Sequence, residues 1–309
     1  MTAQAPATRA RTAVAAPRPI RQARRKVKPA RVVLHVFLSL TALVWLIPLL
    51  WAVYTSLRPY SETASRGFLT FPKAITGENY ANAWQQADFP HYFWNSLLIT
   101  VPAVLLTLFF AAGIAFFVTR FSFRFNLALL MLFTAGNLLP PQALITPLFQ
   151  MYLKLPLPKW MSDSGLFYNS AWGVIAIHVA FQCGFCTFVL SNYMRTIPHE
   201  ITEAALVDGA PVWRQFFQII LPLCRPAFAA LATLESIWIY NDFFWALVLF
   251  QTGSKRPITS AIANLSGEFF TNPNLVAAGA LMTAVPTLIL YFLLQKQFVA
   301  GLTLGSSKG

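Results

Sequence analysis

Charged residues are scarce in this chain of 309 residues. Only 11% of the chain is charged, whereas soluble domains carry roughly 25% charged residues. Hydrophobic residues make up 57% of the chain, and they include 28 Phe and 9 Trp. This balance excludes an ordinary soluble domain and predicts an all-α protein that crosses a membrane several times.

The sequence also lacks the patterns of a catalytic or metal centre. Cys183 and Cys186 form a C-x-x-C inside an apolar run, which predicts helix packing, and no second pair completes a zinc site. The four histidines are scattered and have no ligand spacing. The tail at residues 301–309 departs from the phosphate-loop spacing, and no other nucleotide fingerprint is present. We therefore expect no metal and no cofactor in this chain, and no enzyme activity.

The net charge of +13 is concentrated near the N-terminus, because residues 1–31 hold nine of the 23 basic residues and no acid. A basic segment directly before a hydrophobic span is primarily a topology signal, so we expect no nucleic-acid binding. Residues 1–31 have too few apolar residues to build a core, which predicts a disordered cytoplasmic tail.

Six hydrophobic runs follow, each long enough to cross a hydrocarbon layer of roughly 30 Å. The third run contains Pro140, Pro141 and Pro147, which predict a broken or strongly bent helix. The expected spans lie at about residues 32–54, 93–119, 126–152, 167–193, 227–250 and 274–294.

The expected organisation places both termini in the cytoplasm. In this arrangement the cytoplasmic segments hold 16 of the 23 basic residues, which agrees with the positive-inside rule chiefly through the N-terminal tail. The predicted parts are the tail 1–31, a first transmembrane helix with an extracytoplasmic loop over 32–92, a five-helix core over 93–300 and a cytoplasmic tail 301–309.

A polar stretch from Glu203 to Pro222 separates the fourth and fifth runs. The residues before Gly209 can form a short helix, and glycine at its exit suits a left-handed conformation. A second helical run, PVWRQFFQII, follows until Pro222 and Pro226 interrupt it. The small side chains of Ala204 and Ala205 would let a partner approach the backbone. An amphipathic connector between two membrane helices is the alternative interpretation.

The spacing of Glu-Ala-Ala, Gly209, Ile219 and Leu221-Pro222 resembles, position for position, the EAA loop of permease subunits in binding-protein-dependent ABC importers. The resemblance covers most of residues 70–305 and is closest to the carbohydrate-uptake (maltose-type) permeases. It implies that the loop at 203–222, hereafter the EAA loop, binds a groove on a cytoplasmic ATPase. The residues that the resemblance assigns to this contact are Glu203, Ala204, Ala205, Asp208, Gly209, Ile219, Leu221 and Pro222.

The resemblance also implies the remaining components of such an importer. They are a second homologous permease, two ATPase subunits that bind ATP and Mg²⁺, and an extracytoplasmic solute-binding protein, around a multi-pass subunit in a bacterial-type inner membrane. The implied function is transport of a sugar or sugar-like solute. Glycerol phosphate or another small solute remains an alternative, and an ion-coupled secondary transporter is the alternative from another class.

Two acidic residues, Glu235 and Asp242, lie in the fifth hydrophobic run, where a charge is costly. On one continuous helix, Trp238 and Trp245 fall within roughly 80° of Glu235, so one face would carry acids and indoles. Carbohydrates favour such a mixture of flat apolar surfaces and directed acceptors. Hydrogen bonding and packing between helices is the alternative role.

The segment Asn241-Asp242-Phe243 resembles a Trp-Asn-Asp/Glu-Phe segment of the same family, with Tyr240 in place of the tryptophan. We therefore predict a substrate pathway that includes Asn241 besides the two acids and the two indoles. Weaker candidates of the same kind are Asn137, Gln142 and Gln182.

Overall fold

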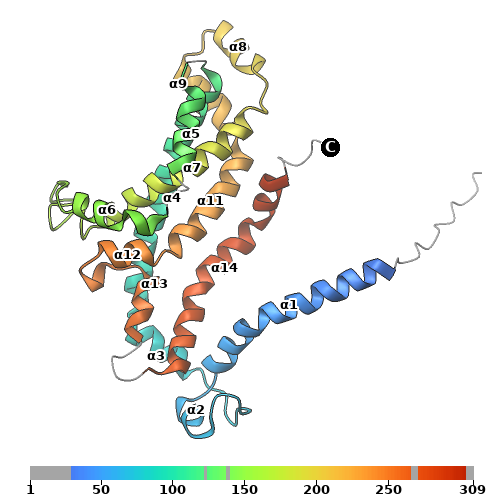
Figure 1. Cartoon of the computed structure of the whole chain (residues 1–309), viewed down its shortest axis with the longest axis vertical. Coiled ribbons are helices and arrows are strands. Elements are labelled where there is room, and N and C mark those ends of the chain that lie inside the picture. The colour runs from blue at the N-terminus through green and yellow to red at the C-terminus, as the bar shows by residue number, and fades with distance from the viewer. Residues whose placement is uncertain (1–28, 122–123, 137–139, 266–270, 304–309) are drawn as a thin grey trace, which may run out of the picture. The chain divides into compact units, whose positions relative to one another are not determined.

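The computed structural model describes residues 29–121, 124–136, 140–265 and 271–303 (Figure 1). These residues are mostly helical and contain no β-strand, which confirms the predicted all-α class. Most of the tail predicted at 1–31, residues 304–309 and Asn137 lie outside the described residues. Residues 301–303, predicted as tail, continue the last helix.

The first long helix, α1, begins at Pro29, three residues before the predicted span. Its side chains from Pro29 to Leu49 are all exposed, as expected of an apolar helix that faces lipid. The helices are α1 (Pro29–Ser56), α2 (Tyr60–Arg66), α3 (Glu78–Gln86), α4 (Phe89–Arg120), α5 (Asn126–Gly136), η1 (Pro141–Leu144), α6 (Ile145–Tyr152), α7 (Ala171–Met194), α8 (Glu200–Val207), α9 (Val212–Arg214), η2 (Gln215–Ile220), α10 (Leu221–Leu223), α11 (Arg225–Tyr240), α12 (Phe244–Leu249), η3 (Gly253–Lys255), α13 (Ile258–Ala261), η4 (Ile262–Leu265) and α14 (Pro273–Thr303).

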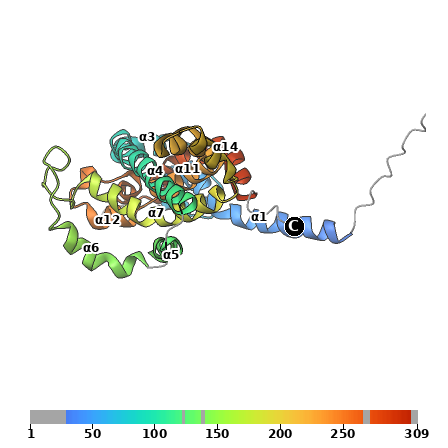
Figure 2. The ribbon, with the colours of Figure 1, turned by 90° about the horizontal axis from the view of Figure 1, so that it is seen from above.

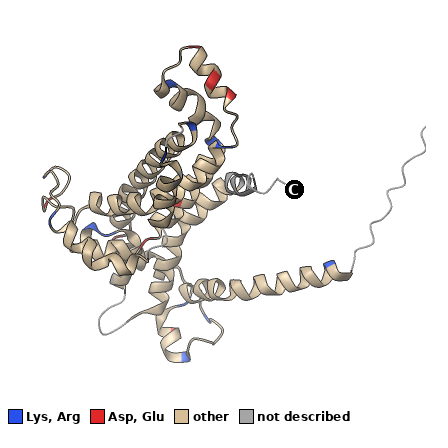
Figure 3. Ribbon diagram, turned by 45° about the horizontal axis from the view of Figure 1, so that its top comes forward, with Lys and Arg blue, Asp and Glu red and all other residues tan. Residues whose placement is uncertain are grey.

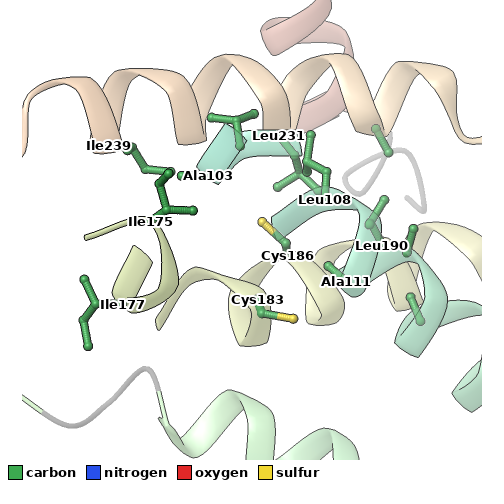
Figure 4. Packing of buried hydrophobic residues seen from close by; sticks show 14 of the residues in the cluster. Ala103, Leu108, Ala111, Ile175, Ile177, Cys183, Cys186, Leu190, Leu231 and Ile239 are labelled. Atoms are coloured by element: carbon green, nitrogen blue, oxygen red, sulfur yellow. The ribbon is translucent and has the colours of Figure 1, made fainter. Parts of the chain in front are cut away.

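The chain divides into two compact units, Met1–Leu49 and Leu50–Gly309. In the second unit, α4 packs against α7 and α11, and α14 packs against α11 (Figure 2). Alanines of α4, among them Ala103 and Ala111, are fully buried. Small side chains let membrane helices approach closely, since packing rather than water exclusion drives their association. Figure 4 shows these alanines beside Cys186 and Leu190 of α7 and Leu231 of α11.

Four of the described helices are long and apolar enough to cross a membrane: α1, α4, α7 and the Pro273–Gln295 part of α14. The number rises to six if each of two bent helix pairs is one span. The ribbon of the long helices is uncharged along most of its length, whereas acidic positions are marked on α8 (Figure 3). The structure therefore agrees with four to six spans.

The predicted break in the third hydrophobic run is confirmed. The helix α5 ends at Gly136, and the 3₁₀ turn η1 begins at Pro141, ahead of α6. The helical segments on either side are bent by 91°. Prolines at this point cannot donate the backbone hydrogen bonds that a continuous helix requires.

The fifth hydrophobic run does not form the continuous helix predicted over 227–250. The helix α11 ends at Tyr240 and α12 begins at Phe244. Asn241 Nδ2 donates to the Ile237 carbonyl at 2.8 Å, which satisfies a backbone group at the end of α11. Asp242 then accepts from backbone N–H groups of α12. These two side chains satisfy the helix ends that a break leaves unpaired.

A hydrogen-bonded cluster fixes the segment that follows α1. The guanidinium of Arg58 is buried and donates to the Phe68 carbonyl and Thr70 Oγ1, each at 3.0 Å. Asn274 of α14 donates through Nδ2 to the Arg58 carbonyl at 3.0 Å and the Thr55 carbonyl at 2.8 Å. The start of α14 is thereby connected to the segment near the end of α1.

Glu62 completes this cluster. Its carboxylate accepts from the backbone N–H of Lys73 at 2.9 Å and lies 3.5 Å from Arg58 and 2.9 Å from Arg66. The Lys73 N–H, the Ala74 N–H and the two guanidinium groups lower the pKa of the Glu62 carboxyl, against the opposing effect of burial. The segment is therefore held by an ionised carboxylate.

Candidate functional site

The first half of the EAA loop is a short helix that ends in a Schellman motif. The helix α8 stops at Val207, and Gly209 has a φ of +73°. The Gly209 N–H donates to the Leu206 carbonyl at 3.0 Å, and the Ala210 N–H donates to the Ala205 carbonyl at 2.9 Å. This pair of bonds defines the motif, and it confirms the predicted left-handed helix exit at glycine.

The second half of the EAA loop is helical from Val212 to Leu223, and its middle is a π-helix at Gln215–Ile220. Pro222 lies inside this run, so the prediction that Pro222 would interrupt it was wrong. Because Pro222 has no N–H, the carbonyl one turn earlier has no α-helical donor, which favours a widened turn. The chain bends by 75° between Leu223 and Arg225, where α11 begins.

Polar and apolar side chains of the EAA loop are exposed together. Glu203, Ala204 and Asp208 are exposed, whereas Ala205 is buried. Leu206 is 67% exposed, Val207 87% and Trp213 56%. Large apolar side chains gathered on a polar loop are typical of a contact surface for a partner.

The EAA loop is tied to the helix bundle at its N-terminal side. Arg120, the last residue of α4, donates through one guanidinium nitrogen to the Met194 carbonyl at 3.0 Å and the Ile197 carbonyl at 3.2 Å. Met194 ends α7, and α8 begins shortly after Ile197. The end of α4 thus caps the end of the helix from which the loop extends.

A second candidate site is a pocket of about 350 Å³, hereafter the tryptophan pocket. It collects side chains from α7, from both sides of the α11–α12 break and from η1. The residues that line it are Pro141, His178, Phe181, Gln182, Trp238, Asp242 and Trp245. Three of the predicted pathway residues, Trp238, Asp242 and Trp245, are therefore brought together.

Asp242 is the polar centre of the tryptophan pocket. Its two carboxylate oxygens accept from the Trp245 N–H at 3.4 Å and the Ala246 N–H at 3.2 Å, at the start of α12. His178 Nε2 lies 3.6 Å from Asp242 Oδ2. The two backbone N–H groups orient the carboxylate toward the start of α12, and the His178 imidazole of α7 lies beside it.

The indoles of Trp238 and Trp245 have different surroundings. The sequence predicted both on one face of a continuous helix, but the break between α11 and α12 places them on two helices. Trp238 of α11 is 44% exposed and packs against Phe185, with ring centroids 5.5 Å apart. Trp245 of α12 is 5% exposed and packs against Phe181 at the same centroid distance. The indoles reach one pocket from two helices.

Glu235 and Asn241 do not line the tryptophan pocket. Glu235 is fully buried in α11, and its Oε1 accepts from Cys186 Sγ of α7 at 3.2 Å. Asn241 is exposed and caps α11. Of the weaker candidates, Gln182 lines the pocket and Gln142 lies in η1.

Comparison with known protein families gives one decisive match. Residues 103–299 match the family described as "Binding-protein-dependent transport system inner membrane component". The chain belongs to this family. The permease is therefore a multi-pass inner-membrane transport protein, and this membership decides against an ion-coupled secondary transporter.

Curated relatives match the permease over most of their length. The diacetylchitobiose uptake system permease protein NgcG of Streptomyces coelicolor is 31% identical over 88% of this chain and 87% of its own. The melibiose/raffinose/stachyose import permease protein MelC of Bacillus subtilis is 31% identical over 90% of this chain and 96% of its own.

A solved structure shares the fold of the permease. The crystal structure of a bacterial ABC transporter that imports the acidic polysaccharide alginate contains a chain with a TM-score of 0.72 and 24% identity. The match covers 87% of the permease and 96% of that chain. At this identity the likeness shows the fold alone.

Sequence reasoning missed the part of His178 in the pocket of the permease. His178 lies in an apolar run, and only the fold brings it to Asp242. This role had little indication in the sequence, because no acidic or metal-ligating residue lies three or four positions from His178. Among the described residues, no group of three His, Cys, Asp or Glu side chains could hold a metal ion.

Proposed function

We propose that this permease forms half of the translocation pathway of an ABC importer for a sugar or sugar-like solute. The two relatives described above are named for the uptake of oligosaccharides, and the tryptophan pocket combines indoles with a carboxylate. Sugar rings pack on flat apolar surfaces, while their hydroxyl groups need directed acceptors.

The proposed complex contains a second homologous permease, two cytoplasmic ATPase subunits and an extracytoplasmic solute-binding protein. A second alginate transporter structure with the same fold (TM-score 0.63, 17% identity) is a complex with an alginate pentasaccharide-bound periplasmic protein, which supports the last of these partners. The ATPase subunits bind ATP and Mg²⁺, and this chain binds neither.

The proposed coupling runs through the EAA loop. Closure of the ATPase subunits on ATP moves α8, and the permease pair changes between inward-open and outward-open states. Both termini lie in the cytoplasm in this arrangement. The observation that carries the proposal is the loop itself, with Glu203 beside exposed Leu206 and Val207 on a helix whose exit is fixed by Gly209.

Substitution of Glu203 tests this proposal. Removal of one partner of a charge pair buried at an interface costs about 2–5 kcal/mol. Glu203→Ala is therefore expected to leave the permease inserted but to abolish uptake, through loss of the ATPase or of its stimulation. Co-purification of the ATPase and substrate-stimulated ATP hydrolysis in reconstituted complexes are the measurements.

Glu200→Ala is the matched control. Glu200 is an exposed carboxylate in the first turn of the same helix, and it lies outside the motif. Normal ATPase binding and stimulation in Glu203→Ala would contradict the coupling role. Equal loss of ATPase binding in both variants would show that the total negative charge of α8 matters, and not the Glu203 side chain in particular.

A further inference from the structure

We propose that the tryptophan pocket accepts neutral, hydroxyl-rich saccharide units and rejects solutes that carry a carboxylate or a phosphate. This inference rests on the proposed function, since it names the substrate class of the same site. It separates neutral sugars from uronates and glycerol phosphate.

The charge of the pocket is the first argument. Its ionisable lining residues are Asp242 and His178, and none of the described lining residues is Lys or Arg. With a neutral imidazole the pair carries one negative charge, and with a protonated imidazole the charges cancel. In neither state does the pocket offer a net positive charge to an anion.

The orientation of the polar groups is the second argument. Asp242 is held by two backbone N–H groups and keeps further acceptor capacity, because a carboxylate has about four lone-pair sites. His178 is only 5% exposed, and its Nε2 lies 3.6 Å from Asp242 Oδ2. Hydroxyl groups can donate to the Asp242 carboxylate, whereas ionised carboxylate and phosphate oxygens can only accept and carry a charge of the same sign.

Along α4, α7 and α11, Lys and Arg occur only at helix ends. In α4 the arginine is the last residue, Arg120, which is engaged with two backbone carbonyls. In α11 it is the first residue, Arg225. The helix α7 has neither Lys nor Arg. Binding sites for carboxylate and phosphate groups usually present Arg or Lys directly.

The size and apolar lining of the pocket fit this substrate class. A volume of about 350 Å³ lies at the low end of the roughly 300–1,000 Å³ found for ligand pockets, which suits a small ligand or one unit of a longer one. Trp238 is 44% exposed and supplies a flat surface for a sugar ring. The pocket therefore combines stacking with acceptor groups.

The test measures binding to the permease pair with its ATPase subunits in nanodiscs, without the solute-binding protein, whose own selectivity would otherwise decide the result. The probes are neutral di- and trisaccharides of glucose, galactose and N-acetylglucosamine, the matching glucuronate and galacturonate compounds, and glycerol 3-phosphate. Saturation-transfer NMR reports which solutes bind. We expect binding of neutral saccharides and at least about tenfold weaker binding of each anionic counterpart, since like charges in contact repel strongly.

Asp242→Asn is the main variant, because asparagine also caps helix N-termini and keeps the start of α12 intact. It is expected to reduce the preference for neutral over anionic solutes about tenfold. Gln182→Lys, which introduces a cation from α7, is expected to shift the preference in the same direction. Glu235→Gln is the matched control, since it removes a carboxylate of α11 that lies outside the pocket, and it should leave the preference unchanged.

Equal binding of neutral and anionic solutes by the unaltered complex would overturn this inference and leave the importer assignment intact. An unchanged preference in both Asp242→Asn and Gln182→Lys would overturn it as well. Binding of no solute in the panel would instead overturn the proposed sugar-import function, and this inference with it.

Discussion

Gly209 is restricted by its backbone conformation and not by its surroundings. Its φ is +73°, and a side chain built at this position would meet no atom within 4 Å. A residue with a Cβ in the left-handed region costs roughly 1–2 kcal/mol, and a β-branched residue is strained further. The Schellman motif at the end of α8 therefore depends on glycine.

Gly209→Val is expected to leave the permease inserted and to weaken ATPase binding. The chain after α8 would take another direction, so the orientation of α8 relative to the rest of the EAA loop would change. Gly209→Ala should show the same defect to a smaller degree. Co-purification of the ATPase from membranes is the measurement. Gly253→Ala is the control, since a Cβ there also meets no atom within 4 Å and Gly253 has no positive φ. Normal ATPase binding by Gly209→Val would contradict this role.

Asn274 gives a second prediction at the scale of one residue. It is fully buried and donates to the Thr55 and Arg58 carbonyls and to Thr63 Oγ1. Asn274→Ala leaves these groups without their donor, so we expect a loss of about 1–3 kcal/mol in the free energy of unfolding. Thermal unfolding in detergent measures it. The control is Asn82→Ala, since Asn82 is an exposed asparagine of α3. Equal unfolding temperatures for both variants would contradict the prediction.

Single residues could be predicted from the sequence where their role is local. Glycine after a short helical run predicts a left-handed exit, and Gly209 has one. The contact of His178 with Asp242 could not be predicted, because the two residues lie on different helices and only the packing of α7 beside the α11–α12 break brings them together.

At the scale of elements, hydrophobicity located the helices but not the break in the fifth run. Tyr240, Phe243 and Phe244 continue the apolar pattern across the break. The side chains of Asn241 and Asp242 end one helix and begin the next, and a capping pair of this kind was the available signal. In the third hydrophobic run, Pro140 and Pro141 allowed the break to be predicted from the sequence.

The segment between α2 and α3 gives a prediction about pH. The folded state holds the pKa of Glu62 below its usual value, mainly through the Lys73 N–H. The contribution of this carboxylate to stability is present above the pKa of the unfolded chain, and it is lost as the pH falls through the lower folded value. We therefore expect the protection of amides at residues 67–76 against hydrogen exchange, relative to the intrinsic rate at each pH, to fall at acidic pH.

Glu62→Gln supplies the comparison for this experiment. The neutral side chain loses its ion pairs with Arg58 and Arg66 at every pH, so the amide protection of this segment should already be lower at neutral pH and should change less on acidification. Glu78→Gln is the control, because Glu78 is an exposed carboxylate of α3 that has neither contact. An unaltered pH response in Glu62→Gln would contradict the assignment.

At the scale of the whole molecule, the basic N-terminal segment and the six predicted spans together predict that both termini face the cytoplasm. Reporter fusions that are active on one side of the membrane only are the measurement. A fusion after Gly309 and a fusion within residues 55–92 are expected to report opposite sides, and a fusion between Ile197 and Glu200 should agree with the C-terminal one. A cytoplasmic signal from 55–92 would contradict the topology.

The hydrogen bonds of Arg120 join the start of the EAA loop to two helices of the bundle. The segment around Ile197 connects α8 to the last turn of α7. The Arg120 guanidinium donates to a carbonyl of that turn, at Met194, and to the carbonyl of Ile197. Arg120 is the final residue of α4, which packs along α7, so the start of the EAA loop is attached to both helices. A displacement of α8 is therefore expected to be transmitted to α4 as well as to α7.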